Sequence, residues 1–115
     1  MRSLEKILEE YLDACLKQED AQKRGDAKTY NKQQRIIQEK RKNLKSNNQY
    51  GLEKLEPFLE HPSSIVRLAT AYSLIPIFPD KAKQVLISLA EVRGTTGFNA
   101  KMTLSEWEKG NLKFD

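Results

Sequence analysis

Apolar residues recur at intervals of three and four near the start of the chain, which is the spacing of one face of an α-helix. This stripe consists of Leu4, Ile7, Leu8, Tyr11, Leu12, Cys15 and Leu16. Ser3 has the side chain of an N-cap, and Gly25 is the residue type that most often follows the end of a helix. The pattern therefore predicts a first helix between Ser3 and Gly25.

A second amphipathic pattern follows Asp26, which can cap a helix, and fades in residues 46–51. Its sparse apolar positions are Tyr30, Ile36, Ile37 and Leu44. Two helices joined by such a short turn are expected to form an antiparallel hairpin. Residues 1–22 carry three basic and six acidic side chains, whereas residues 23–45 carry nine basic and two acidic ones. We therefore expect ion pairs along the rims of the hairpin and a hydrophobic seam inside it.

The middle of the chain predicts two further helices. The third contains Leu52, Leu55, Phe58 and Leu59. Pro57 removes a backbone donor inside this helix, so we expect a bend near Glu53. The fourth helix is predicted from Ser64 to Ile75, because Pro76 prevents its continuation. It is apolar on nearly all sides, so either neighbouring helices cover it or it offers one face to a partner.

A fifth helix is predicted after Asp80 and ends before the segment RGTTGF, whose glycines indicate a loop. Its buried stripe is Ala82, Val85, Leu86 and Leu89. A short last helix is predicted in TLSEWEKGNL, since Thr103 and Glu106 have the spacing of a capping box and Gly110 can end the helix. No segment predicts a convincing strand. At 115 residues, the sequence indicates an all-α fold of six helices in a single domain, residues 1–115.

Residues 55–92 resemble a HEAT repeat, a pair of antiparallel helices that stacks into α-solenoids. The resemblance is carried by LEPFL for a first helix kinked at proline, HPSSIVR for the turn, and LATAYSL for the small-residue face of the second helix. The wider chain is similar to a family of small bacterial proteins of uncharacterised function, through TYNKQQRII, PDKAKQVLISLAEV and NAKMTLSEWEKGNL. This resemblance implies a short HEAT-like α-solenoid of about five to six helices in antiparallel hairpins. It also raises the hypothesis of a toxin-immunity protein, and it assigns no active-site residues.

The sequence offers few residues for catalysis or metal binding. His61 is the only histidine and lies in a predicted turn, and Cys15 is the only cysteine and lies on a predicted core stripe. Neither a nucleophile–base pair nor a multi-ligand metal set can be assembled, so we expect a non-enzyme without metal or cofactor. The first twenty residues resemble neither a signal peptide nor a membrane span, and one cysteine cannot form an internal disulfide. A cytoplasmic protein without membrane contact is expected.

The leading functional hypothesis is a protein-binding module, with neutralisation of a bacterial toxin as its most concrete form. If the fourth helix is exposed, its candidate contacts are Arg67, Leu68 and Tyr72. The HEAT resemblance implies a second role for Arg67, as a structural residue that holds the repeat together. A neutraliser of a nuclease would more often present an acidic surface, so the net charge of +4 argues mildly against that class of toxin.

The alternative hypothesis is a nucleic-acid-binding protein that uses the basic second helix. Lys28, Lys32 and Arg35 lie at spacings of four and three, so they can form a positive stripe on one helix face. Such a stripe could neutralise phosphates, or it could contact an acidic protein. It could also be a solvated face that the acidic first helix offsets.

Overall fold

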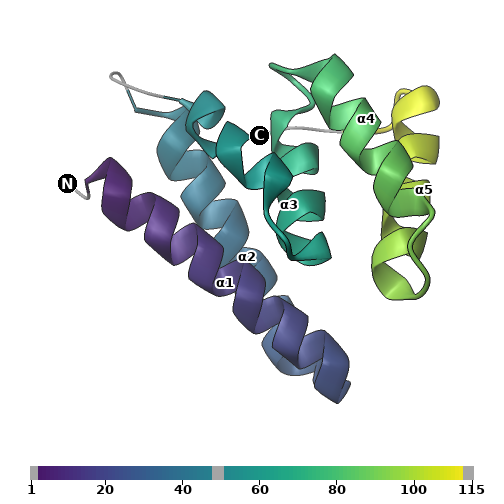
Figure 1. The fold of residues 1–115 in the computed structure, drawn as a ribbon. Coiled ribbons are helices and arrows are strands. Elements are labelled where there is room, and N and C mark those ends of the chain that lie inside the picture. The colour runs from purple at the N-terminus through teal and green to yellow at the C-terminus, as the bar shows by residue number, and fades with distance from the viewer. Residues whose placement is uncertain (1–2, 48–50, 113–115) are drawn as a thin grey trace. The chain divides into compact units, whose positions relative to one another are not determined.

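The computed structural model describes residues 3–47 and 51–112, and these residues form helices and no strand. The elements are α1 (Leu4–Arg24), α2 (Ala27–Lys45), the 3₁₀-helix η1 (Leu52–Glu60), α3 (Ser64–Leu74), α4 (Pro79–Ala90) and α5 (Thr95–Glu108) (Figure 1). The expected all-α class is thereby confirmed. The chain divides into two compact units, one that ends at Leu55 and one that begins at Glu56. Each unit is described by itself, and the expectation of a single domain stays a prediction.

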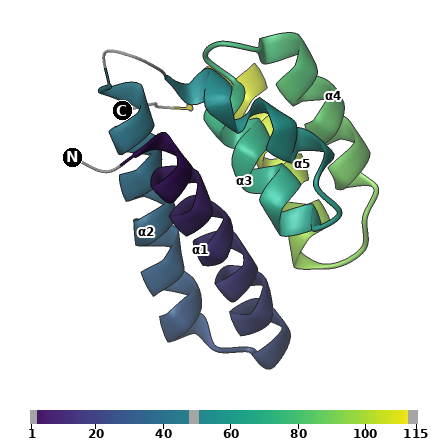
Figure 2. The ribbon, with the colours of Figure 1, turned by 60° about the vertical axis from the view of Figure 1, so that its left-hand side comes forward.

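The first unit is built on a hairpin in which α1 and α2 run side by side (Figures 1 and 2). The Ser3 hydroxyl accepts a hydrogen bond from the Lys6 amide at 3.2 Å, so Ser3 caps α1 as predicted. Gly25 ends α1 in the left-handed conformation, at φ 69°, which costs a residue without a Cβ little. Asp26 then caps α2 by accepting the Thr29 amide at 3.0 Å. Two caps back to back therefore make the tight turn.

The seam of this hairpin is apolar with a few polar bonds. Its buried apolar side chains are Ile7, Tyr11, Ala14, Cys15, Ala21, Ile37 and Leu44. Gln18 is also buried, and its side-chain amide nitrogen donates to the Gln34 side-chain oxygen Oε1 across the helix pair at 2.7 Å. This bond satisfies polar atoms that would otherwise be costly to bury. The predicted hydrophobic seam is present, with a specific polar contact inside it.

The third predicted helix is a 3₁₀-helix rather than a bent α-helix. Leu52, Leu55 and Phe58 are three residues apart, and side chains three residues apart align in a 3₁₀-helix. Leu52 and Leu55 are buried and Phe58 is half-buried. Pro57 lies inside this element. The expectation of a bent α-helix was therefore wrong, and Leu59, the fourth apolar residue of this segment, is buried together with Leu52 and Leu55.

In the second unit α3 packs against α4, α4 packs against α5, and α5 also contacts α3. Ser63 caps α3, since its hydroxyl accepts the Val66 amide at 3.3 Å. The buried side chains of the unit are Leu59, Ile65, Val66, Thr70, Ala71, Ser73, Leu74, Ile75, Ala82, Leu86, Leu89, Thr96 and Ala100. Ser73 donates its hydroxyl to the Ala69 carbonyl at 2.7 Å, which lets a polar side chain lie in the core.

The last helix begins earlier than the sequence predicted. The segment RGTTGF was expected to be a loop, but α5 starts at Thr95 and includes Gly97. Thr103 is therefore an interior residue of α5, where its hydroxyl donates to the Asn99 carbonyl at 2.9 Å, and the predicted capping box was wrong. Gly97 is buried, and a Cβ added there would lie 1.7 Å from the Val92 carbonyl oxygen. This glycine is required by a close backbone approach and not by a turn.

Candidate functional site

A row of exposed cations lies on α2. The side chains of Lys28, Lys32 and Arg35, which we call the basic face, are all exposed. Their spacings of four and three residues place them on one stripe of the helix. None of the three forms an ion pair with another residue of the described ranges 3–47 and 51–112. The predicted positive stripe is therefore present, with its charges free of partners within that part of the chain.

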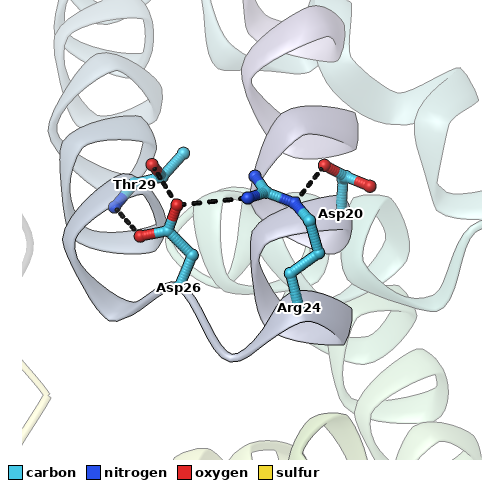
Figure 3. Close-up of polar contacts among 4 residues, drawn as sticks. All are labelled: Asp20, Arg24, Asp26 and Thr29. Carbon is cyan, nitrogen blue, oxygen red and sulfur yellow. Dashed lines mark hydrogen bonds and ion pairs between the residues drawn. The ribbon is translucent and has the colours of Figure 1, made fainter.

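The acidic residues near the turn are bound to a different cation. Arg24 bridges the Asp20 carboxylate at 2.8 Å and the Asp26 carboxylate at 3.3 Å (Figure 3). Asp26 also accepts the Thr29 amide and, at 2.7 Å, the Thr29 hydroxyl. These bonds to Thr29, together with the charge of Arg24, hold the pKa of Asp26 below its usual value. Asp20 and Asp26 therefore pair with Arg24 and do not neutralise the positive charges of the basic face.

One lysine of the basic segment is buried. Lys40 is 4% exposed, and its Nζ lies 3.5 Å from a Glu10 carboxylate oxygen and 3.4 Å from one of Glu39. The contact with Glu10 joins α2 to α1, which is the kind of ion pair that the sequence predicted between the two helices of the hairpin. Removal of one partner from a buried pair leaves a costly unpaired charge. Lys40 therefore has a structural role in the hairpin and does not belong to the exposed surface.

Arg67 is engaged by the turn that precedes its own helix. Its Nη1 donates to the His61 carbonyl and its Nη2 to the Ser64 hydroxyl, each at 3.1 Å. His61 accepts the Ser63 amide on Nδ1 at 3.0 Å, so the imidazole also serves the turn. These bonds favour the structural interpretation of Arg67 over an interface role.

The other two candidate contacts on α3 are partly covered. Leu68 and Tyr72 are half-buried, whereas Ile75 is buried. The sequence left open whether neighbouring helices cover this helix completely. They cover Ile75, but they do not fully cover Leu68 and Tyr72. Leu68 and Tyr72 keep some surface that a partner could contact.

The sequence reasoning missed an apolar surface on α5. Phe98 is 62% exposed and Met102 is 45% exposed, and the two are one helical turn apart. We call this pair the α5 apolar face. A hollow beside Phe98 is lined by Ala90, Glu91, Val92, Arg93, Gly94, Phe98 and Lys101. The i, i+4 spacing of Phe98 and Met102 could have indicated this shared helix face. It predicts a shared face only if both residues lie in one helix, and the sequence predicted a loop at Phe98.

The residues with reactive side chains are placed as structural groups. Cys15 is fully buried, and this burial raises the pKa of its thiol to about 12. The thiol is therefore neutral at physiological pH. Within residues 3–47 and 51–112, no three side chains among His, Cys, Asp and Glu lie together in a way that could hold a metal ion. In the same ranges, no helix has the length and apolar character needed to cross a membrane.

The fold and these surfaces define a small all-helical protein with two exposed surfaces of different chemistry. The chain belongs to the family described as Domain of unknown function (DUF2019), whose sequence pattern matches residues 5–108. The crystal structure of the protein RPA1889 from Rhodopseudomonas palustris has a similar fold, with a TM-score of 0.92. The alignment covers 100% of this chain and 96% of that one, at 20% identity. No curated protein matches the chain.

Proposed function

We propose that this chain is a non-catalytic protein-binding module that holds its partner on the α5 apolar face. The observation that carries this proposal is the exposure of Phe98 and Met102 one turn apart on α5. Large apolar side chains that are exposed together are typical of interaction sites. Aromatic residues and methionine are also enriched at the centres of protein interfaces. A hollow beside Phe98 adds a place for a side chain of the partner.

The energy available from this face is sufficient for an anchor. A phenylalanine buries roughly 200 Å² when fully covered, so covering the 62% of Phe98 that is exposed removes about 120 Å² from water. At about 25 cal/mol per Å², this burial contributes about 3 kcal/mol before the costs of association. A contribution of this size is typical of an interface hot spot. Met102 extends the contact by one turn.

The helical stack supports the same function as a scaffold. We propose that α3, α4 and α5 form a short HEAT-like arrangement, because each helix packs mainly against the next one in the chain, with a smaller contact between α3 and α5. Stacked helices offer a broad surface whose shape is set before the partner arrives. Leu68 and Tyr72 on α3 remain secondary contact candidates, since both keep accessible surface.

In its most concrete form, the proposed partner is a bacterial toxin, and the chain is its immunity protein. Two features support this form of the proposal: the chain is small, and its helices offer a preformed surface. In addition, residues 3–47 and 51–112 hold no cluster of side chains that could bind a metal ion. The net charge of +4 is poorly suited to a basic nuclease, so we expect a toxin of another class.

A capture experiment tests this proposal. The purified full-length chain is used as bait in a lysate of the source cell, with the product of the adjacent gene as the first candidate. The wild type and Phe98→Glu are compared, and Gln84→Glu is the control because Gln84 is exposed on α4 and the added charge is the same. We expect a stable partner that Phe98→Glu loses and Gln84→Glu keeps.

A rescue assay extends the test to the toxin hypothesis. Cells that express the candidate toxin should survive with the wild-type chain and die with Phe98→Glu. The protein-binding proposal fails if no stable partner is captured and no toxin-expressing cell is rescued. The immunity proposal alone fails if a partner is captured that has no toxic effect.

A further inference from the structure

We propose that the basic face of α2 binds the phosphate backbone of nucleic acid without reading its base sequence. This site does not depend on the proposed function, because it lies on a different unit from α5. It uses Lys28, Lys32 and Arg35, which are exposed and form no ion pair with other residues of the described part of the chain. Cations without protein partners are free to replace the counterions of a polyanion.

The spacing of these cations fits a row of phosphates. Lys28 and Arg35 are seven residues apart, which is a rise of about 10 Å along the helix axis. Successive phosphates on one strand of DNA advance by about 3.4 Å along the duplex axis while the strand winds around it, and the long side chains of Lys28, Lys32 and Arg35 can each reach a different phosphate. Lys32 lies between the two ends of the row. One helix face can therefore neutralise about three phosphates of one strand.

The two acidic residues of the segment that contains this row, Asp26 and Glu39, are already bound. Asp26, at the start of α2, is held by Arg24 and by two hydrogen bonds from Thr29. Glu39, one turn beyond Arg35, contacts the buried Lys40. These contacts reduce the repulsion that the two carboxylates would exert on an approaching phosphate.

The surface chemistry favours nucleic acid over an acidic protein as the ligand. The buried centre of a protein interface is usually more apolar than its rim. The large apolar side chains that are exposed in the described chain lie on other elements: Leu16, Ile77, Ile87, Val92, Phe98 and Met102. Asn31 and Gln38, which flank the row, are polar. Contacts to phosphate need only charge and hydrogen-bond donors, which this face supplies.

The same chemistry predicts that binding ignores sequence. Tyr30 is the aromatic residue of α2, and it is half-buried, so it offers little surface on which a base could stack. Three phosphate contacts predict a slope of about −2.7 when the logarithm of the association constant is plotted against that of the salt concentration. With this slope, the affinity falls about 40-fold when the salt concentration rises from 50 to 200 mM.

The test is fluorescence anisotropy with the full-length chain and a labelled 20-base-pair DNA duplex of mixed sequence, in a salt series. We expect the slope of about −2.7 for the wild type and a decrease of about 0.9 in its magnitude for Lys28→Gln, Lys32→Gln or Arg35→Gln. The triple variant should not bind. Lys17→Gln is the control, because Lys17 is also exposed, on α1, but is paired with Asp13 at 2.9 Å. It should retain the wild-type slope, and a second duplex of different sequence should bind equally.

Five results would overturn the proposal. They are no binding at 20 mM salt, wild-type binding by a triple variant with unchanged circular dichroism, an equal loss in Lys17→Gln, unequal binding of the two duplexes, and tighter binding of poly-glutamate than of DNA. The last result would assign the basic face to an acidic protein. Phe98→Glu in the same assay separates the two proposals, since it should bind DNA as the wild type does whether or not the α5 apolar face binds a protein.

Discussion

Substitution of Gly97 by alanine tests the packing at the start of α5. A Cβ at this position would lie 1.7 Å from the Val92 carbonyl oxygen and 2.8 Å from its carbonyl carbon. Contacts below 3.0 Å are essentially absent for real Cβ atoms, so the backbone must move by more than 1 Å. Both clashing atoms belong to the main chain and cannot rotate away as a side chain could. The start of α5 must therefore shift away from the end of α4.

Two opposing effects decide the sign of this change. Alanine is more favourable than glycine inside a helix by about 1 kcal/mol. Overpacking in a well-packed region costs about 1–3 kcal/mol and occasionally more, and a clash with fixed backbone belongs at the upper end. We therefore expect a net destabilisation of about 2 kcal/mol, which is a decrease in Tm of roughly 8 °C for a protein of this size.

Urea unfolding followed by circular dichroism measures this difference. Thr95→Ala is the matched control, because Thr95 is exposed in the same first turn of α5 and should change stability by less than about 0.5 kcal/mol. If Gly97→Ala is as stable as the wild type, or more stable, helix propensity outweighs the clash. The close approach of Val92 to Gly97 would then be refuted as the reason for this glycine.

Three further predictions concern caps and titrating groups. The pKa of the buried Cys15 thiol is raised from 9.0 to about 12, so Ellman's reagent at pH 8 should react with it only after unfolding, and rapid labelling of the folded protein would contradict this. The stability that the neutral thiol contributes should be present below pH 9 and be lost as the pH rises from 9 toward 12. Ser63→Ala should reduce the free energy of unfolding by about 1 kcal/mol because α3 loses its cap, whereas Ser88→Ala, at an exposed position of α4, should change it little. The pKa of Asp26 is lowered by its bonds to Thr29 and by Arg24, so its contribution to folding stability should be present above the pKa of the unfolded chain and be lost as the pH falls below about 4. Asp26→Asn should flatten this part of the curve of stability against pH, and an unchanged curve would contradict the prediction.

The sequence predicted those parts of the fold that depend on local chemistry. Ser3 and Asp26 accept the amide hydrogen bonds expected of helix caps, and Gly25 ends α1 in the left-handed conformation. These features follow from residue type and from the apolar spacing beside it. The start of α5 could not be predicted in this way, because Gly97 is set by the approach of the Val92 carbonyl, a contact made only in the folded chain.

The candidate surfaces follow the same division. The positive stripe of Lys28, Lys32 and Arg35 could be predicted from spacing, but its lack of ion pairs depends on where the carboxylates of α1 lie. Phe98 was missed because the predicted loop removed it from its helical neighbour Met102. The bonds of Arg67 to His61 and Ser64 could be expected only through the resemblance to a HEAT repeat.

The most direct test of the account is the affinity of the captured partner for the wild type and for Phe98→Ser, measured by calorimetry with purified proteins. Loss of an anchor worth at least about 2 kcal/mol predicts that Kd rises by about 30-fold or more. Gln84→Ser, at an exposed position of α4, should leave Kd unchanged. Equal Kd values for the wild type and Phe98→Ser would contradict the assignment of the α5 apolar face as the binding surface.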